Sequence, residues 1–455
     1  MKTRFSQWTV VTMVVMLMLL TACSGGSEKP AAESPKVTEN KGAEATETPK
    51  VEVKKDPVEL RFTVINDGEA KNVEPIVEAF HKKYPYVTVK VETLPDYNAA
   101  VITKAASGDL GDVFQVLDTQ LQNFVANKIL YPLDDYLSAN QFKFDDIYPA
   151  MLRLSQVDGK TYILPRDYNH IVIYVNTTLL KNEGIPMPGN DWKWDDFVNI
   201  LKQTTKKDSS GQFIQGGPIV DPFFEAQWTG IVRGHNGSLV DEENKKVTLS
   251  DPKVLQSLKE YFDLFKEGYM FDAWSKELPK VDWTEGKSAF MIAVRPGIMS
   301  IEEWAATAGF EWDVLPFPEL PERRAVGSGM SGYGVFAKSK HTEEAAALVS
   351  FITSEEGQKQ FETSGNSIPV LKSMANSQVW RDLPVPGKNM DAFVIYPEAD
   401  VVSELITELP LEVASIVRSK LREGFNKYID NSSSLEDAMK AVDEQANAKW
   451  KELSK

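Results

Sequence analysis

Alternation of apolar and polar residues is strongest directly after residue 57 and predicts a repeating order of strands and helices. Residues 58–65 alternate with period two and end at Asn66-Asp67-Gly68, which indicates a strand followed by a turn. Further along, the spacing of apolar residues switches between the helical and the strand period. The expected elements are strands over 58–65, 86–93 and 112–117 and helices over 73–84 and 97–106. This alternation predicts βαβ units, a mainly parallel sheet and the α/β class.

The last part of the chain is patterned mainly for helices. The expected helices span 342–351, 354–363, 405–428 and 434–450. Thr342, Ser354 and Ser434 are residue types that cap helix N-termini, and acidic residues that suit the positive end of a helix dipole follow each of them. No internal repeat with a period of about 20–50 residues is visible, which argues against a solenoid or a propeller.

The N-terminus follows a third pattern. Lys2 and Arg4 precede an apolar run over residues 10–20, shorter than the ~20 residues that span a bilayer core but typical of a signal peptide. The run ends in Leu-Thr-Ala-Cys-Ser-Gly-Gly, where Cys23 is the only cysteine of the chain and so cannot form an internal disulfide. This stretch resembles a bacterial lipobox, which implies that residues 1–22 are a lipoprotein signal peptide and that Cys23 carries a lipid anchor with acyl chains such as palmitate. An ordinary signal peptide ending near a cysteine is the alternative.

Residues 23–57 form an expected tether. They are rich in Lys, Glu, Thr, Pro, Ala and Val and contain no aromatic residue. Such a segment buries too little apolar surface to offset its ordering entropy, so we expect it to be disordered. Its root-mean-square span would be about 30 Å, enough to hold a folded domain clear of lipid headgroups.

Charge and composition narrow the choice of partners. Without residues 1–22, which contain Lys2 and Arg4, the chain has 48 basic and 66 acidic residues, a net charge of −18. Because phosphate backbones require a basic face, no nucleic acid partner is expected.

Nine of the ten tryptophans follow residue 57, and this part is long enough for two or three hydrophobic cores.

Signatures of enzymes and metal sites are weak. The four histidines, at 81, 170, 235 and 341, are scattered, and no zinc motif, Gly-x-Ser-x-Gly or Walker loop occurs. The acidic pairs at 134–135, 145–146 and 195–196 are adjacent in sequence, and such residues do not face each other as an acid–base pair must. Residues 144–147 also lack the alternating oxygen ligands of a calcium loop. We therefore expect no enzyme activity, cofactor or metal.

Four groups of motifs occur in order between residues 158 and 370. They are DGKTYILP (158–165) with IYVNTTLL (173–180), EGIP (183–186) and DWKWDDF (191–197); WTEGKSAFM (283–291); SGYGVFAKSKHTEEAA (331–346); and SEEGQ (354–358) with GNSIPV (365–370). In order and spacing they resemble the family 1 extracellular solute-binding proteins, the group that includes maltose-binding protein. Two features depart from the family: residues 294–297 read Val-Arg-Pro-Gly in place of a glycine–tryptophan pair, and Arg323-Arg324 is a basic patch in an acidic chain.

The resemblance implies a two-lobed periplasmic-binding-protein fold, type II-like, with a hinge that the chain crosses more than once. By analogy, lobe 1 comprises 58–168 plus 317–365 and lobe 2 comprises 169–316 plus 366–455. It further implies a monomer, lipid-anchored at the extracellular face of the cell membrane, that captures a sugar or oligosaccharide and delivers it to an ABC transporter permease. A ligand-sensing partner of a membrane kinase and a surface carbohydrate-active enzyme are the alternatives.

Candidate site residues follow from the chemistry of sugar capture. Aromatic faces stack on the apolar C–H surfaces of a sugar ring, and planar polar groups bind its hydroxyls; both should lie at strand ends and in loops facing a cleft. Single tryptophans are more often core residues, and Asp67 and Asp118 also suit helix caps, so these alternatives stay open. The polar candidates that follow expected strands are Asp67 and Asp118. The resemblance implies Arg166, Asp167 and the aromatic Tyr168 at the first crossover between the lobes, where a simple Arg–Asp ion pair is the alternative, and Arg295 in a loop where the family often places a cleft residue, where a surface arginine is the alternative. The other aromatic candidates are Trp228, Trp283, Trp304 and Tyr333, of which the resemblance favours Trp304 and Tyr333.

Overall fold

A computed structural model of the chain describes residues 55–362, 367–381, 383 and 385–454. The expected signal peptide, Cys23 and nearly all of the expected tether lie outside these residues. Within the described ranges, no helix combines the length and the apolar character needed to cross a membrane.

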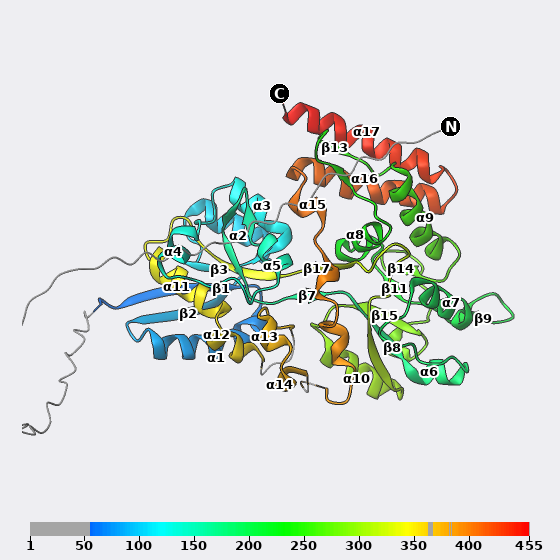
Figure 1. Cartoon of the computed structure of the whole chain (residues 1–455), viewed down its shortest axis with the longest axis horizontal. Helices are drawn as coiled ribbons and strands as arrows, with labels where there is room; N and C mark the ends of the chain where they lie inside the picture. The colour runs from blue at the N-terminus through cyan, green and yellow to red at the C-terminus, as the bar shows by residue number, and fades with distance from the viewer. Residues whose placement is uncertain (1–54, 363–366, 382, 384, 455) are drawn as a thin grey trace, which may run out of the picture. The chain divides into compact units, whose positions relative to one another are not determined.

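A five-stranded sheet forms from the first strands of the described chain, in the order β2-β1-β3-β18-β6 (Figure 1). β1 is parallel to β2 and β3, as predicted, whereas β18 runs antiparallel to both β3 and β6. β18 comes from a distant segment, and local periodicity carries no information about which strand it joins or in which direction. The strands are β1 (Val58–Val64), β2 (Val87–Thr93), β3 (Val113–Leu117), β6 (Ile163–Pro165) and β18 (Ser331–Val335).

Amphipathic helices pack around this sheet. α1 buries Val73, Ile76 and Phe80, spaced three and four residues apart on one face. It begins earlier than predicted because the Asn66 side chain accepts a hydrogen bond from the Glu69 backbone N–H at 2.9 Å and so caps the helix. The helices are α1 (Asp67–Lys83), α2 (Tyr97–Ser107), α3 (Asp118–Ala126), α4 (Asp134–Ala139), α5 (Pro149–Arg153), α11 (Thr342–Thr353) and α12 (Glu355–Glu362).

The predicted N-caps have different outcomes. The Ser354 hydroxyl accepts the Gly357 backbone N–H at 3.3 Å, and the Ser434 hydroxyl accepts the Asp437 N–H at 3.1 Å, which are capping bonds. The assignment of Thr342 is wrong: it is the first helical residue of α11, and His341 occupies the cap position without a side-chain hydrogen bond.

A second, three-stranded sheet has the order β15-β8-β16 and is antiparallel at both pairings. The prediction of parallel pairing is wrong here, because β15 and β16 return to β8 from far along the chain. All five residues of β8 are buried: Ile173 and Val175 lie in a second core, and Val172 and Tyr174 lie in a core on the other face of the sheet. The strands are β8 (Val172–Asn176), β15 (Phe290–Ala293) and β16 (Trp312–Pro316).

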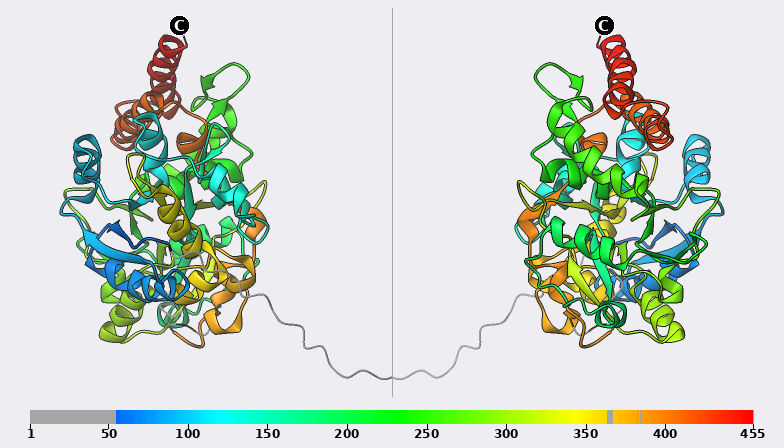
Figure 2. Two further views of the ribbon diagram at one scale, coloured as in Figure 1. Left: turned by 90° about the vertical axis from the view of Figure 1, so that its left-hand side faces the viewer. Right: turned by 90° about the vertical axis from the view of Figure 1, so that its right-hand side faces the viewer.

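Helices cover this second core, and two of them form the C-terminal end of the described chain (Figure 2). Gly424 of α16 lies against α17, where an added Cβ would come within 2.8 Å of Met439 Cε. The single helix predicted over 405–428 is wrong, since Pro410 separates α15 from α16; proline has no N–H to donate and disfavours helix in the residue before it. The helices are α6 (Thr177–Asn182), α7 (Trp194–Thr204), α8 (Glu225–Gly234), α9 (Pro252–Lys266), α10 (Ile298–Ala308), α15 (Glu404–Thr407), α16 (Leu411–Ile429) and α17 (Leu435–Leu453).

Three short strands pair with each other in the order β19-β17-β7 (Figure 1). Two of them, β7 and β17, lie on the chain segments that run between the two larger sheets. β17 is antiparallel to β7 and parallel to β19. Gly327 of β17 approaches α8 so closely that an added Cβ would lie 1.5 Å from the Ala226 carbonyl oxygen, so only glycine fits. This three-strand connection agrees with a hinge crossed more than once. The strands are β7 (Asn169–His170), β17 (Val326–Gly329) and β19 (Asp400–Val401).

Short elements complete the described chain. The predicted lobe boundaries stay a prediction; α13, which the prediction places in lobe 2, contacts Asp146, whose side chain accepts the Ser373 N–H at 3.1 Å. The remaining elements are β4 (Gln156–Val157), β5 (Lys160–Thr161), β9 (Lys206–Lys207), β10 (Phe213–Gln215), β11 (Ile219–Val220), β12 (Val240–Asp241), β13 (Lys246–Val247), β14 (Phe271–Asp272), α13 (Lys372–Ala375), α14 (Gln378–Arg381), η1 (Trp283–Glu285), η2 (Met390–Phe393) and η3 (Pro397–Ala399).

Candidate functional site

A cavity of about 390 Å³ lies where β7 and β17 meet the carboxyl end of β3 and the start of α8. Its volume is within the range of about 300–1,000 Å³ that is usual for small-molecule sites. Its wall contains residues near the five-stranded sheet and residues near the three-stranded sheet β15-β8-β16. They are Gln115, Leu117, Asp118, Thr119, Arg166, Asp167, Asn169, Phe224, Glu225, Ala226, Val294, Gly327, Ser328, Gly329, Met330, Ser331, Ser403 and Ile406.

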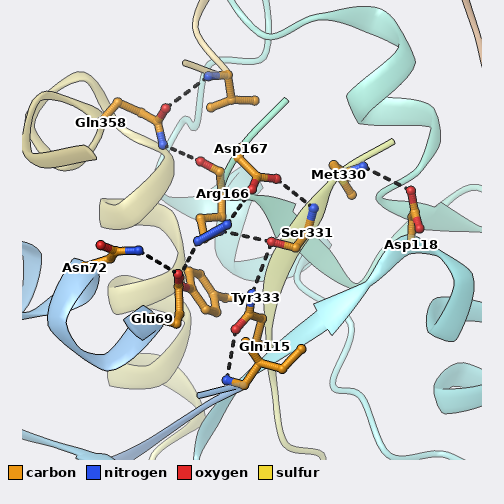
Figure 3. Close-up of polar contacts among 12 residues, drawn as sticks. Glu69, Asn72, Gln115, Asp118, Arg166, Asp167, Met330, Ser331, Tyr333 and Gln358 are labelled. Carbon is orange, nitrogen blue, oxygen red and sulfur yellow. Dashed lines mark hydrogen bonds and ion pairs between the residues drawn. The ribbon is translucent and has the colours of Figure 1, made fainter. Parts of the chain in front are cut away.

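Arg166 is the centre of a polar network on one wall of the cavity (Figure 3). Its guanidinium donates to Glu69 Oε1 at 2.5 Å, to Asp167 Oδ2 at 2.5 Å and to Ser331 Oγ at 3.0 Å. The Tyr333 hydroxyl donates to the same Glu69 oxygen at 2.5 Å. Burial alone would lower the pKa of Arg166, but the Asp167 and Glu69 carboxylates reverse this effect and raise it. The cation is therefore permanent and already paired within the protein.

Hydrogen bonds to Ser331 hold the cavity wall in place (Figure 3). The Ser331 backbone N–H donates to Asp167 Oδ1 at 2.8 Å, and Gln115 Nε2 donates to Ser331 Oγ at 3.2 Å. Gln115 in turn accepts the Ile65 backbone N–H at 3.1 Å, which ties β1, β3 and β18 together at this edge. Burial raises the pKa of Asp167, while the Arg166 cation acts in the opposite direction.

Asp118 follows β3 and lies at the first residue of α3. Its carboxylate accepts the backbone N–H groups of Thr119 at 2.7 Å and Met330 at 3.0 Å. Burial raises the pKa of Asp118 to about 6; the two backbone donors oppose this rise, and the charges of Glu225 and Asp167 add to it. A carboxylate in this position is stabilised by any ligand that brings hydrogen-bond donors to it.

The start of α8 supplies the opposite wall. Phe224 lines the cavity and is 46% exposed, so its ring is available to a ligand. Glu225 accepts hydrogen bonds from the Ser403 hydroxyl at 3.1 Å and from the Arg418 guanidinium.

Asn169 Oδ1 is buried and accepts no hydrogen bond from the described protein atoms, which leaves it able to accept one from a ligand. Three carboxylates and a single basic residue line the cavity, so it is rich in acceptors.

Three of the ten predicted site residues lie together in the cavity wall: Asp118, Arg166 and Asp167. The other polar candidates lie elsewhere. Asp67 is exposed in the first turn of α1 and accepts the Thr93 hydroxyl at 3.0 Å. Arg295 is fully buried, with its guanidinium carbon 4.2 Å from the centre of the Trp380 ring, although its neighbour Val294 does line the cavity.

None of the predicted aromatic platforms lines the cavity. Tyr168 is buried, stacks on Tyr148 at 4.3 Å between ring centres and donates a 2.5 Å hydrogen bond to Asp400. The other four pack in the cores because large rings bury much apolar area there: Trp228 (2% exposed), Trp283 (4%) and Tyr333 (0%) are buried, and Trp304 is half-buried against the core. Of these, Tyr333 still acts on the site indirectly, through its bond to Glu69.

The sequence analysis missed Asn169, Phe224, Glu225, Ser331 and Ser403. The signal available for Phe224 and Glu225 was the segment Asp-Pro-Phe-Phe-Glu at 221–225, which follows β11 as a loop should follow a strand. Ser331 and Ser403 carried no such signal, because serine at a strand end is common in any fold. Over the described residues, no group of three or more His, Cys, Asp or Glu side chains could hold a metal ion.

Comparisons with known proteins place this geometry in context. The family model described as "Bacterial extracellular solute-binding protein" matches residues 75–385. The Multiple sugar-binding protein of Streptococcus mutans is 22% identical over 335 residues, covering 70% of this chain and 76% of its own. The Galactooligosaccharide-binding protein of Bacillus subtilis is 25% identical over 334 residues, covering 69% of this chain and 74% of its own.

Solved structures show the same fold. An ABC substrate-binding protein from Listeria monocytogenes in complex with cycloalternan aligns with a TM-score of 0.72 at 20% identity, over 87% of this chain and 99% of that one. The sugar-binding protein MalE from Xanthomonas citri aligns with a TM-score of 0.73 at 18% identity, over 87% and 98%. The two-lobed α/β architecture is therefore confirmed.

Proposed function

The chain belongs to the bacterial extracellular solute-binding proteins, and we propose that it captures a sugar or oligosaccharide and delivers it to the permease of an ABC importer. Its relatives in Streptococcus mutans and Bacillus subtilis carry the names of sugar-binding and galactooligosaccharide-binding proteins. The family and the structural neighbours are binding proteins rather than enzymes, which agrees with the absence of enzyme signatures in the sequence. The proposed partners are a sugar and a membrane permease, and the proposed state is a monomer.

The observation that carries the proposal is the acceptor-rich cavity beside the connecting strands. Asp118, Asp167 and Asn169 present oxygen atoms to it, and each oxygen can accept a hydroxyl hydrogen of a sugar. Phe224 offers the apolar face on which a sugar ring can stack. Charged groups already paired within the protein, such as Arg166, hold their positions before the ligand arrives and reduce the entropy lost on binding.

The strength required of such a site is modest. A micromolar dissociation constant corresponds to about −8 kcal/mol. Burying a phenylalanine side chain contributes roughly 1.5–3 kcal/mol, and hydrogen bonds to charged groups contribute about 1.5–3 kcal/mol each. One aromatic contact and several hydroxyl–carboxylate bonds therefore exceed the required value before association costs are subtracted.

Contacts from both sides of the cavity link binding to closure. Asp118 and Arg166 belong to the surroundings of the first sheet, whereas Phe224 and Glu225 stand at the start of α8, which packs in the second core. A ligand that contacts both groups favours the closed arrangement by its differential affinity, and a shift from 1:99 to 99:1 takes about 5.5 kcal/mol. The closed form would then be what the permease recognises, so binding alone suffices for function.

We also propose that the mature protein is held at the extracellular face of the cell membrane by a lipid on Cys23. The family is extracellular or periplasmic, which supports the location. The lipobox-like Leu-Thr-Ala-Cys and the absence of any other cysteine support the anchor. Two or three acyl chains would hold the protein firmly, whereas one chain gives only marginal binding.

The proposal is tested by thermal unfolding of the soluble domain with and without a panel of sugars, followed by small-angle scattering with any sugar that stabilises it. At 100 times its dissociation constant, a true ligand adds about 2.7 kcal/mol of stability. We expect stabilisation by at least one sugar, a smaller radius of gyration in its presence, and recovery of the sugar unaltered. Turnover of the sugar, or a panel of mono- and oligosaccharides without effect, would contradict the proposal.

A further inference from the structure

A second hollow lies on the part of the molecule built around β14 and α16. It is a groove of about 650 Å³ whose wall includes Trp274, Leu278, Asp272, Arg422 and Asn426. Trp274 is 73% exposed, the only exposed tryptophan among the nine that the structure describes. Because Trp274 lines the groove and most of its surface is exposed, it presents an apolar ring face on which a sugar can stack.

The geometry of two neighbouring strands places this groove next to the cavity. β11 and β14 are parallel, with Val220 opposite Asp272, and the Ala273 N–H donates to the Val220 carbonyl at 2.9 Å. Their carboxyl ends therefore lie at one edge, side by side (Figure 1). The chain after β11 leads to Phe224 in the cavity wall, and the chain after β14 leads to Trp274 in the groove. The carboxyl edge of such strands is where α/β folds bind ligands.

Helix α16 links the two hollows with charged side chains. Arg418 pairs with Glu225 of the cavity wall, and Arg422, one helical turn or roughly 6 Å further along, contacts Asp272 of the groove at 2.6 Å and Asp221 at 2.8 Å. The Arg418, Arg422 and Asp221 side chains are 28–38% exposed, so they form a partly open polar strip between Phe224 and Trp274. Guanidinium and carboxylate groups of this kind can bind vicinal hydroxyls.

We infer that the binding site extends along this edge and takes a linear oligosaccharide too long for the cavity, with Trp274 as the stacking platform for its distal rings. The inference rests on the proposed function and adds a preference for chain length to it. The backbone that carries the platform is held in place, since the Trp274 backbone N–H donates to Asp272 Oδ1 at 3.0 Å and the Ser275 backbone N–H donates to the Asp272 carbonyl at 2.9 Å. Asp272 also accepts a hydrogen bond from Arg422 at 2.6 Å, so the Trp274 backbone and the polar strip are both bonded to this carboxylate.

Calorimetry with two graded series of sugars tests the inference. The probes are maltose through maltoheptaose and the corresponding galacto-oligosaccharides, titrated into wild-type protein and into Trp274→Ala. In the series that binds, we expect affinity to rise with chain length in the wild type. Trp274→Ala should raise the dissociation constants of the longest members about tenfold, the effect of losing one aromatic partner, and leave the shortest unchanged. Trp274→Phe should restore most of the loss, and Ile102→Ala, at an exposed apolar position outside both hollows, should have no effect.

The remaining outcomes separate the two proposals. Equal affinities of wild type and Trp274→Ala for every chain length would overturn the extended site and leave sugar binding in the cavity intact. If such a variant nevertheless lost transport in cells, the Trp274 surface would belong to the permease contact instead. If no sugar of either series and no member of the mono- and oligosaccharide panel bound the wild type, the proposed function would fail, and the extended site with it.

Discussion

Replacing Asp118 by asparagine should make the stability of the protein less sensitive to pH. The pKa of Asp118 is raised from 3.8 to about 6, chiefly by burial. In the folded state the carboxyl therefore holds its proton to higher pH than in the unfolded state, so stability falls as pH rises from about 4 to about 6. At 1.36 kcal/mol per pKa unit, ionisation of Asp118 at pH 7 costs about 3 kcal/mol. Asparagine removes this cost but loses one of the two backbone hydrogen bonds, which is worth about 1 kcal/mol.

The difference in the free energy of unfolding between Asp118→Asn and wild type is expected to change sign between pH 7 and pH 4. Asp118→Asn should be more stable than wild type by about 2 kcal/mol at pH 7 and less stable by about 1 kcal/mol at pH 4. Urea denaturation of both proteins without ligand, followed by tryptophan fluorescence at several pH values, measures the difference. Asp109→Asn is the matched control with the opposite slope, because Lys104 and Arg61 lower the pKa of Asp109 and its contribution to stability is lost on acidification. A difference between Asp118→Asn and wild type that stays constant from pH 4 to pH 7 would show that this carboxyl is not held protonated by the fold.

Three further substitutions test other parts of the molecule. Phe224→Ala should weaken binding of any sugar ligand by about 1–3 kcal/mol in calorimetry with an unchanged melting temperature, since the ring is exposed; unchanged affinity would remove it from the site. Arg166→Met should lower the free energy of unfolding by about 3–5 kcal/mol in denaturant titrations, because it leaves Glu69 and Asp167 as unpaired buried charges; a loss below about 1 kcal/mol would mean that the network contributes little. Cys23→Ala should release the domain into the medium or leave it unprocessed in cell fractionation, and a processed protein that stays bound to cells would contradict the lipid anchor.

Individual strands and helices were predictable from sequence because the spacing of neighbouring side chains determines them. The strands and helices between residues 58 and 117 end within a few residues of the expected positions, since period-two and helical spacing reflect which side chains face the core. The antiparallel joining of β18 to β3, and of β15 and β16 to β8, could not be predicted in this way. Those pairings depend on segments far apart in the chain, and a strand pattern does not encode its partner.

The candidate site residues also divide into those that have a local sequence signal and those that have none. Asp118 was found because it follows a strand, where parallel sheets place their functional groups, and Arg166 because the resemblance places the first crossover between the lobes directly after residue 165. The aromatic candidates failed to reach the cavity because a tryptophan on a core face and a tryptophan on a binding face have the same local sequence signal. Trp274 shows the converse, since only its exposure in the structure distinguishes it from the eight other described tryptophans.

The connection made by β7, β17 and β19 limits how the two halves of the molecule can move. Pairing of β17 with both β7 and β19 opposes sliding of one strand past another, a motion that a single linking strand would allow. Gly327, pressed against the Ala226 carbonyl, leaves no room for sliding of β17 past α8. Under the proposed closure, a joint restricted in this way would return to the same end point each time. The proposed permease could then recognise one rigid docking surface, whichever bound molecule caused the closure.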